Sequence, residues 1–163
     1  MVTVRQAHER DAEAMLDLHV ASIEAFGPDA YDQSQVDAWA YKEGGPSYPI
    51  DTPEHVVVVA ETDDGRLAGF GDVSPPESEL YAVYVRPDHA EAGVGTAILD
   101  RLERRARQRG ADHLELTASK NAVGFYEQAG YERLGVVEHE PSGPHDVTFE
   151  CVRMRKSLDR VTE

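Results

Sequence analysis

Two glycines, Gly93 and Gly95, stand one residue apart where an apolar stretch gives way to a helix-forming one. A glycine removes the side chain where the backbone has to come close to another group. The unpaired N–H groups at a helix start converge on one point and, with the helix dipole, favour an anion, best of all a phosphate. The stretch 80–99 therefore predicts a phosphate-binding turn between a strand and a helix.

Two common nucleotide-binding motifs do not fit this spacing. A dinucleotide fingerprint needs a third glycine where this chain has Ile98, and its first glycine follows the strand directly, whereas residues 86–92 intervene here. A P-loop needs Gly-Lys-Ser/Thr, but Gly95 is followed by Thr96 and Ala97. Both motifs are excluded, and the glycines alone leave open a helix entry that binds nothing.

The elements that position this turn follow from hydrophobic periodicity and from turn signals. Strands are expected at 2–4, 55–61, 66–73, the start of 80–99, 113–117, 131–139 and 146–154. Helices are expected over 12–26, where the first ends before Gly27–Pro28, and over 34–41, 94–109 and 121–129. This order predicts one α/β domain over residues 1–163, with a mixed, mostly antiparallel sheet of about seven strands and flanking helices.

Two details of this pattern bear on packing. The valine run 56–60 is typical of a strand that is covered on both faces. His19 lies on or near the apolar face of the first predicted helix, where a histidine is more often packed than catalytic.

The charge balance limits the partners. Thirty-one acidic residues oppose sixteen basic ones, which gives a net charge of −15 that repels nucleic acid and anionic membrane. The surface is either that of an ordinary acidic protein or an adaptation to high salt, where screening weakens the self-repulsion of carboxylates. Melting curves over a range of salt separate the two, because a stability that does not fall as salt is removed would exclude the adaptation.

Other compositional signals point to a cytoplasmic protein without metal. The longest apolar run, 56–60, is too short to cross a bilayer, and the first residues do not resemble a signal peptide. Cys151 is the single cysteine, so no disulfide framework is expected. The seven histidines are scattered without metal-ligand spacing.

Two motifs carry a resemblance to a known family. LYAVYVRPDHAEAGVGTAIL resembles the acetyl-coenzyme-A-binding motif of the GCN5-related N-acetyltransferases (the GNAT family), and NAVGFYEQAGY resembles their second signature. The order of elements matches that fold over nearly the whole chain. AYDQSQVDAWA and CVRMRKSL also resemble, less specifically, a subfamily of small acetyltransferases.

The resemblance implies that acetyl-CoA is the co-substrate and assigns residues to it. In the family, backbone groups of the fourth strand hold the pantetheine arm and the thioester carbonyl, and the loop after it holds the pyrophosphate. Asn121 bonds the cofactor or only caps the helix after it. The implied cofactor-binding residues are Val83, Tyr84, Val85, Ala90, Glu91, Ala92, Gly93, Val94, Gly95, Thr96 and Asn121.

One position departs from the family pattern. The phosphate loop usually begins with Arg or Gln, where this chain has Ala90. Backbone N–H groups supply most of the grip on a pyrophosphate, so binding is expected to survive with weaker affinity. The five arginines within residues 101–109 could compensate, or they could form a solvated helix face that balances Asp100 and Glu103.

The resemblance also implies the catalytic roles. Tyr126 stands where the family places a tyrosine that protonates the leaving sulfur, although it could be a packing aromatic. Glu79 is the candidate base that removes the ammonium proton, with Glu24 and Glu77 as rivals, and Tyr84 could relay that proton through water. Tyr31 and Trp39 are candidate walls of the acceptor pocket, with ordinary core as the alternative.

These residues predict an N-acetyltransferase that acts on a primary amine of a small molecule by direct attack in a ternary complex. One alternative is a protein or peptide N-acetyltransferase, and another is an acyl-CoA-binding sensor without catalysis. Dimers are common in proteins that resemble this chain, so a homodimer is compatible with it.

Overall fold

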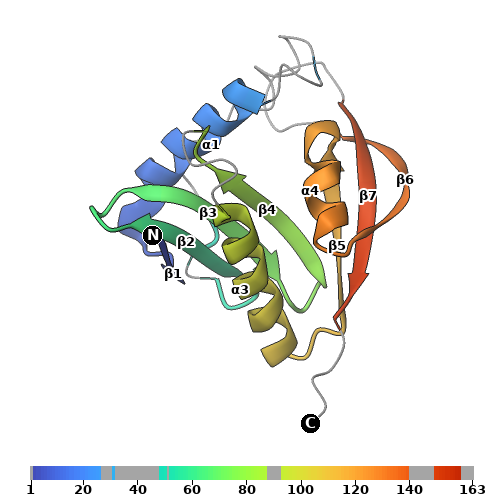
Figure 1. Ribbon diagram of the computed structural model, residues 1–163. Helices are drawn as coiled ribbons and strands as arrows, with labels where there is room; N and C mark the ends of the chain where they lie inside the picture. The colour runs from blue at the N-terminus through green and yellow to red at the C-terminus, as the bar shows by residue number, and fades with distance from the viewer. Residues whose placement is uncertain are drawn as a thin grey trace.

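The computed structural model describes residues 2–26, 31, 48–50, 52–87, 93–139 and 149–158. A seven-stranded sheet runs through its centre in the order β1-β2-β3-β4-β5-β7-β6 (Figure 1). The strands are β1 (Val2–Gln6), β2 (Val56–Thr62), β3 (Leu67–Ser74), β4 (Glu79–Val85), β5 (His113–Ser119), β6 (Glu132–His139) and β7 (Phe149–Ser157). The helices are η1 (Glu9–Asp11), α1 (Ala12–Phe26), α3 (Val94–Gln108), η4 (Lys120–Ala122) and α4 (Val123–Gln128).

Helices α1 and α3 cover opposite faces of the sheet, as Figure 1 shows, and β2 contributes to both cores. Val56 and Val58 pack in the cluster that contains Ile98 and Leu102 of α3. Val57 and Val59 pack on the other face, in the cluster that contains Met15 and Leu18 of α1. The predicted strand that is covered on both faces is therefore confirmed.

Helix α3 lies so close to β3 that two strand positions have no room for a side chain. A Cβ at Gly69 would lie 2.7 Å from the Tyr84 carbonyl oxygen and 2.8 Å from Ile98 Cδ1. A Cβ at Gly71 would lie 2.6 Å from Leu102 Cδ1. These glycines let the helix that begins at the predicted phosphate turn pack directly on the strand beside β4.

Strands β4 and β5 run parallel but separate almost at once. Their register contains the single pair Glu79↔Glu115, supported by a 2.8 Å bond from the Glu115 N–H to the Ser78 carbonyl. Just beyond it, the register of β4 against β3 skips Tyr81, which is a bulge between Leu80 and Ala82. A bulge bends its strand and increases its twist. The bulge therefore directs the rest of β4 away from β5.

The predicted α/β fold, with a mixed and mostly antiparallel seven-stranded sheet, is confirmed. The last strand was expected at 146–154 but is Phe149–Ser157, and the helix expected from 121 is α-helical only from Val123. The helix expected over 34–41 lies outside the described residues. Within the described part of the chain, no helix is long and apolar enough to span a bilayer.

Gly69→Ala tests the close packing of α3 on the sheet. The new methyl group would meet a backbone carbonyl, which cannot turn aside as a side-chain end can, so the free energy of unfolding should fall by about 2 kcal/mol. Gly124→Ala is the matched control, because its Cβ would meet nothing within 4 Å and Gly124 lies inside α4. Urea denaturation should show the control at or above wild-type stability, and a Gly69→Ala variant as stable as wild type would contradict the packing.

Candidate active site

The start of α3 presents its backbone to one side of the sheet. Gly93 is the N-cap in the left-handed conformation (φ 81°), which favours glycine, and no side chain caps the helix there. The first turn of α3 carries no acidic residue, so the positive end of its dipole is not neutralised within the helix. This helix start can therefore accept a phosphate, in line with the spacing of its two glycines.

The spacing of the glycines suggested that Gly95 makes room for a phosphate, but its nearest neighbour is the ring of Phe125. A Cβ at Gly95 would lie 3.1 to 3.2 Å from the Phe125 ring and 3.4 Å from Val85 Cγ2. The absent side chain thus lets α4 approach the first turn of α3. It joins the helix that carries Tyr126 to the helix that begins at the phosphate turn.

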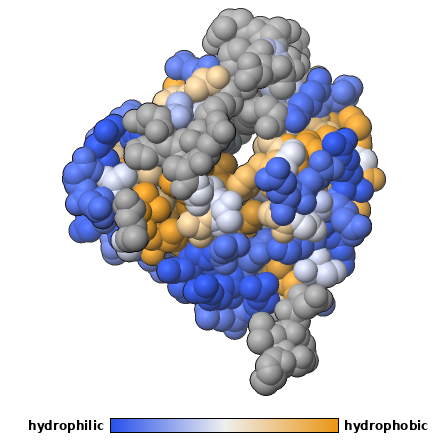
Figure 2. Space-filling view, viewed as in Figure 1, coloured by the Kyte–Doolittle hydropathy of each residue, from blue (hydrophilic) through white to orange (hydrophobic). Residues whose placement is uncertain are grey.

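The divergence of the strands leaves the backbone of β4 open on one side. Val83, Tyr84 and Val85 pair with β3 residues Gly71, Phe70 and Gly69, while no residue of β4 beyond Glu79 pairs with described residues of β5. Figure 2 shows an opening in the surface between β4 and α4, with apolar atoms along its border. Open backbone N–H and C=O groups there can bond an extended amide chain, as a further strand would.

Tyr126 lies in α4 with 7% of its surface exposed. Its ring packs edge-on against Phe125 and Tyr131, with centroids at 5.0 and 5.7 Å. Burial, and next the nearby Tyr84 hydroxyl, raise the pKa of Tyr126 above that of a free tyrosine. The phenol therefore keeps its proton at neutral pH and can donate it.

A buried polar network anchors the neighbourhood of Tyr126. The Tyr131 hydroxyl donates to Glu103 Oε2 (3.0 Å), and Lys156 Nζ donates to Glu103 Oε1 (2.9 Å). One interpretation of the arginine-rich stretch was a solvated face of α3 that includes Glu103. Glu103 is only 4% exposed, so it does not belong to such a face. The network ties α3 to β7 and to the residue that follows α4.

The arginines of α3 lie mostly far from the helix start. With a rise of about 1.5 Å per residue, Arg101 lies about 12 Å and Arg109 about 24 Å along the axis from Gly93. Arg109 donates to the Pro53 carbonyl at 2.9 Å. Most of these side chains can attract an anion over a distance but cannot replace a loop residue in direct contact with it.

Glu79 lies at the end of β4 where this strand still pairs with β5. Its carboxylate accepts two bonds from Arg153, at 2.6 and 2.7 Å, and Arg153 also donates to Glu115 at 3.1 Å. Tyr84 lies five residue steps beyond Glu79, which is about 16 Å along the extended strand β4. The structure thus does not bring the candidate base and the tyrosines of the site into direct contact.

Tyr31 links β7 to η4, the short helix that follows β5. Its hydroxyl donates to the Glu150 carbonyl (2.7 Å) and accepts from the Lys120 N–H (3.0 Å), and Cys151 Sγ lies 3.9 Å away. Burial, the largest cause, raises the pKa of Tyr31 to about 12. Tyr31 is therefore a buried residue with a structural role, and it borders the region where β5 ends.

The structure describes some of the remaining predicted residues and not the others. Val94 is buried and Thr96 is exposed in the first turn of α3. Asn121 lies in η4, but its side chain lies outside the described part of the structure. Outside it as well are Trp39, Ala90, Glu91 and Ala92.

The sequence did not indicate an aromatic cluster on the α1 side of β4. His19 packs against Tyr84, with ring centroids 4.6 Å apart, and Phe70 lies 5.4 Å from both Tyr84 and Tyr48. The expectation that His19 is a packed residue is confirmed. The alternation of apolar residues in β3 could have indicated that Phe70 is buried. The sequence around Tyr48 has no periodicity, so it could not have indicated which residues Tyr48 contacts.

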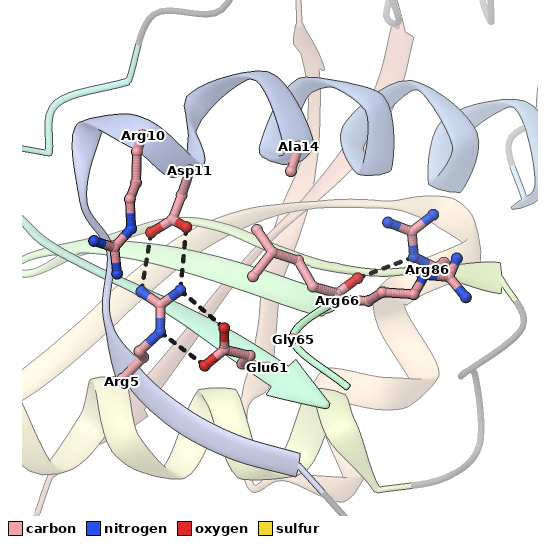
Figure 3. A pocket seen from close by; sticks show the side chains of 9 residues that line it. Arg5, Arg10, Asp11, Ala14, Glu61, Gly65, Arg66 and Arg86 are labelled. Carbon is pink, nitrogen blue, oxygen red and sulfur yellow. Dashed lines mark hydrogen bonds and ion pairs between the residues drawn. The ribbon is translucent and has the colours of Figure 1, made fainter. Parts of the chain in front are cut away.

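A separate cavity of about 350 Å³ lies between the start of α1 and the turn that joins β2 to β3 (Figure 3). Arg5 spans it, donating to Asp11 at 3.0 Å and to Glu61 at 3.3 Å. Its lining residues are Arg5, Arg10, Asp11, Ala14, Glu61, Gly65, Arg66, Leu67 and Arg86. It includes no residue of α3, α4 or β5, so it is not the site at the diverging strands.

Comparison with known proteins agrees with this geometry. Residues 29–156 match the model of the acetyltransferase (GNAT) domain, so the chain belongs to the GNAT acetyltransferase family. An uncharacterized N-acetyltransferase of Methanocaldococcus jannaschii is 25% identical over 148 residues, which are 83% of this chain and 63% of that protein. The chain thus spans less than two thirds of that relative's length.

Solved structures share the fold. A GCN5-related N-acetyltransferase from Rhodopseudomonas palustris is 29% identical and superposes with a TM-score of 0.85 over 96% of both chains. A phosphinothricin acetyltransferase from Sinorhizobium meliloti, solved in complex with acetyl-CoA, is 17% identical with a TM-score of 0.68, over 96% of this chain and 88% of that one. The family that the two motifs predicted is confirmed.

Glu79→Gln tests the contact that fixes the closed end of the strands. The variant loses the charge-assisted bidentate pair with Arg153, and the free energy of unfolding should fall by about 1 kcal/mol. Glu127→Gln is the control, because its 2.8 Å pair with Arg133 is exposed and should contribute little to stability. Equal losses in urea denaturation would contradict a special role for the Glu79 pair.

Proposed function

We propose that this chain is an acetyl-CoA-dependent N-acetyltransferase that acetylates a primary amine of a small molecule by direct attack in a ternary complex. The observation that carries the proposal is the joint position of three features. An uncapped helix start, the open backbone of Val83–Val85 and the buried phenol of Tyr126 meet where β4 leaves β5. Membership of the GNAT family supports the same reaction.

The residues present fit acetyl-CoA. The start of α3 offers N–H groups to the pyrophosphate, with Gly93 in a conformation that exposes them. The open edge of β4 offers alternating donors and acceptors to the pantetheine amides. When bound, acetyl-CoA supplies the activated acetyl group as a thioester.

The chain's own groups then serve the transfer. A backbone N–H in Val83–Val85 holds the thioester oxygen, where negative charge develops as the amine nitrogen attacks. The carbon–nitrogen bond forms, the carbon–sulfur bond breaks, and Tyr126 gives its proton to the departing sulfur. The raised pKa of Tyr126 keeps that proton in place until then.

Of the candidates for the base, Glu79 and the Tyr84 relay differ most in their surroundings. Glu79 would act through several waters, because it lies about 16 Å along the strand from Tyr84 and already accepts two bonds from Arg153. Tyr84 belongs to the aromatic cluster and lies near enough to Tyr126 to raise its pKa, so it is the candidate for passing a proton to water. A base role for Glu79 predicts that Glu79→Gln lowers kcat/KM by at least about tenfold while leaving the KM for acetyl-CoA unchanged. An unchanged kcat/KM would remove Glu79 and leave Glu24, Glu77 and Tyr84 as the candidates.

A small acceptor is favoured over a peptide by the rings beside β4. His19, Tyr48 and Tyr84 pack around the buried Phe70 with ring centroids between 4.6 and 6.5 Å. These three outer rings are half-buried, and their exposed faces can attract an ammonium group. Turnover of peptides but of no small amine would favour the peptide alternative.

Tyr126→Phe tests whether Tyr126 is the proton donor, and the same assay tests whether the chain is an enzyme. The variant keeps the ring packing but loses the proton donor, so kcat should fall about a hundredfold while KM for acetyl-CoA stays within about twofold. Release of thiol from acetyl-CoA against a panel of amines measures both. Tyr81→Phe is the control, because Tyr81 is exposed and its hydroxyl bonds Glu77.

Two results would contradict the assignments. An unchanged kcat in Tyr126→Phe would remove Tyr126 as the acid. Tight binding of acetyl-CoA without turnover of any amine or peptide would identify an acyl-CoA sensor instead.

A further inference from the structure

The cavity between the start of α1 and the β2–β3 turn gathers positive charge that the proposed acetyl transfer does not use. Four arginines line it, against two carboxylates. The whole chain has the opposite balance, with 31 acidic and 16 basic residues. The arginines are Arg5 of β1, Arg10 of η1, Arg66 directly before β3 and Arg86 directly after β4, and the carboxylates are those of Asp11 and Glu61.

Both carboxylates are taken by one of the four arginines. Arg5 is bonded to Asp11 at 3.0 Å and to Glu61 at 3.3 Å. The other three guanidinium groups make no ion pair with any residue that the structure describes. The unbalanced charge of the cavity therefore comes from Arg10, Arg66 and Arg86.

Acidic residues close in the chain do not offset this charge by contact. The Asp64 carboxylate accepts a bond from the Thr62 hydroxyl, which is the largest cause of its lowered pKa, while Arg66 acts on it only weakly through space. The acidic neighbours of Arg10 and Arg66 in the chain are all exposed, and none of them lines the cavity: Glu9, Glu13, Asp63 and Asp64.

Arg66 and Arg86 meet at the first residue of β3. Arg66 directly precedes Leu67, and Arg86 Nε donates to the Leu67 carbonyl at 2.9 Å. The N–H of Arg86 also donates to the next carbonyl of β3, at 2.7 Å, so both its backbone and its side chain are held. Figure 3 shows the two side chains at one end of the cavity, with Arg10 at the other. Two like charges at one end repel each other unless an anion lies between them.

The size and walls of the cavity suit a small organic molecule. Ala14 of α1 and the buried Leu67 give it an apolar wall between the charged ends. Its volume of about 350 Å³ lies in the usual range for small-molecule sites, which is roughly 300 to 1,000 Å³. An inorganic anion alone would leave that apolar wall uncovered.

We propose that this cavity binds a small phosphate monoester, at a site separate from that of acetyl-CoA. The phosphate group lies between Arg66 and Arg86, whose planar guanidinium groups can each donate two parallel bonds to it. A phosphate monoester carries roughly 1.5 to 2 negative charges at neutral pH, which matches two guanidinium groups, whereas a carboxylate offsets only one. The organic part of the ligand lies against Ala14 and Leu67.

The two phosphate sites lie on opposite faces of the sheet. The cavity includes Ala14 of α1, and α1 packs on one face. Helix α3, whose start is the candidate site for the pyrophosphate of acetyl-CoA, packs on the other face (Figure 1). Binding in the cavity therefore does not rest on the proposed function.

Isothermal titration calorimetry of the full chain with phenyl phosphate tests the site. Saturating CoA is present so that the start of α3 is already occupied, and inorganic phosphate and benzoate are titrated for comparison. Phenyl phosphate should bind one per chain and at least about tenfold more tightly than either, because inorganic phosphate lacks the ring and benzoate lacks the second charge. If CoA itself does not bind, the proposed function fails, and the same titration without CoA still tests the cavity.

Arginine variants locate the bound phosphate. Arg66→Gln and Arg86→Gln should each weaken phenyl phosphate binding at least about tenfold. Arg66→Gln breaks no side-chain contact with a described residue, so its thermal melt should match that of wild type. Arg104→Gln is the matched control, because it removes the same charge from an exposed position on α3 and should leave the dissociation constant unchanged.

Four results would overturn the proposal. The first is no binding of phenyl phosphate to wild type at about 10 mM. The second is benzoate that binds as tightly as phenyl phosphate. The third is an equal loss of affinity in Arg104→Gln, which would mean attraction by overall charge. The fourth is loss of phenyl phosphate binding when CoA is added, which would place the phosphate at the start of α3.

Discussion

Parallel pairing between β4 and β5 is limited to Glu79 and Glu115, and the rest of the structure depends on where that pairing stops. Arg153 of β7 holds both carboxylates at this point, and the Tyr81 bulge in β4 follows immediately. The clamp keeps the strands together at one end while the bulge turns β4 away. Backbone groups of β4 beyond Glu79 are thereby left without a pairing partner in β5, although both strands continue unbroken.

The other elements place chemical groups around that opening. Gly69 and Gly71 allow α3 to lie flat on β3, which sets its N-terminus beside the end of β4. Gly95 lets Phe125 approach that terminus, so the distance between the phosphate turn and Tyr126 is fixed by side-chain packing. The network of Glu103, Tyr131 and Lys156 then joins these helices to β7.

The sequence predicted the strands, the phosphate turn and the family, because periodicity and glycine spacing are local signals. It did not indicate the contact between Gly95 and Phe125, since thirty positions separate the two residues. It also suggested Glu79 as a base from its place before the fourth strand, whereas its partner Arg153 comes from the far end of the chain. The last strand extends to Ser157, beyond the expected end at 154, because its pairing with β5 continues to His113↔Ser157.

Hydrogen–deuterium exchange with and without acetyl-CoA tests the open strand edge most directly. Without the co-substrate, amides of Val83–Val85 that point away from β3 should exchange faster than hydrogen-bonded amides of a buried strand. Amides at the start of α3 should also exchange fast. Saturating acetyl-CoA should slow both segments at least tenfold and leave β6 unchanged. Equal exchange of β4 with and without acetyl-CoA would contradict the account, because the divergence of β4 from β5 would then serve another ligand or none.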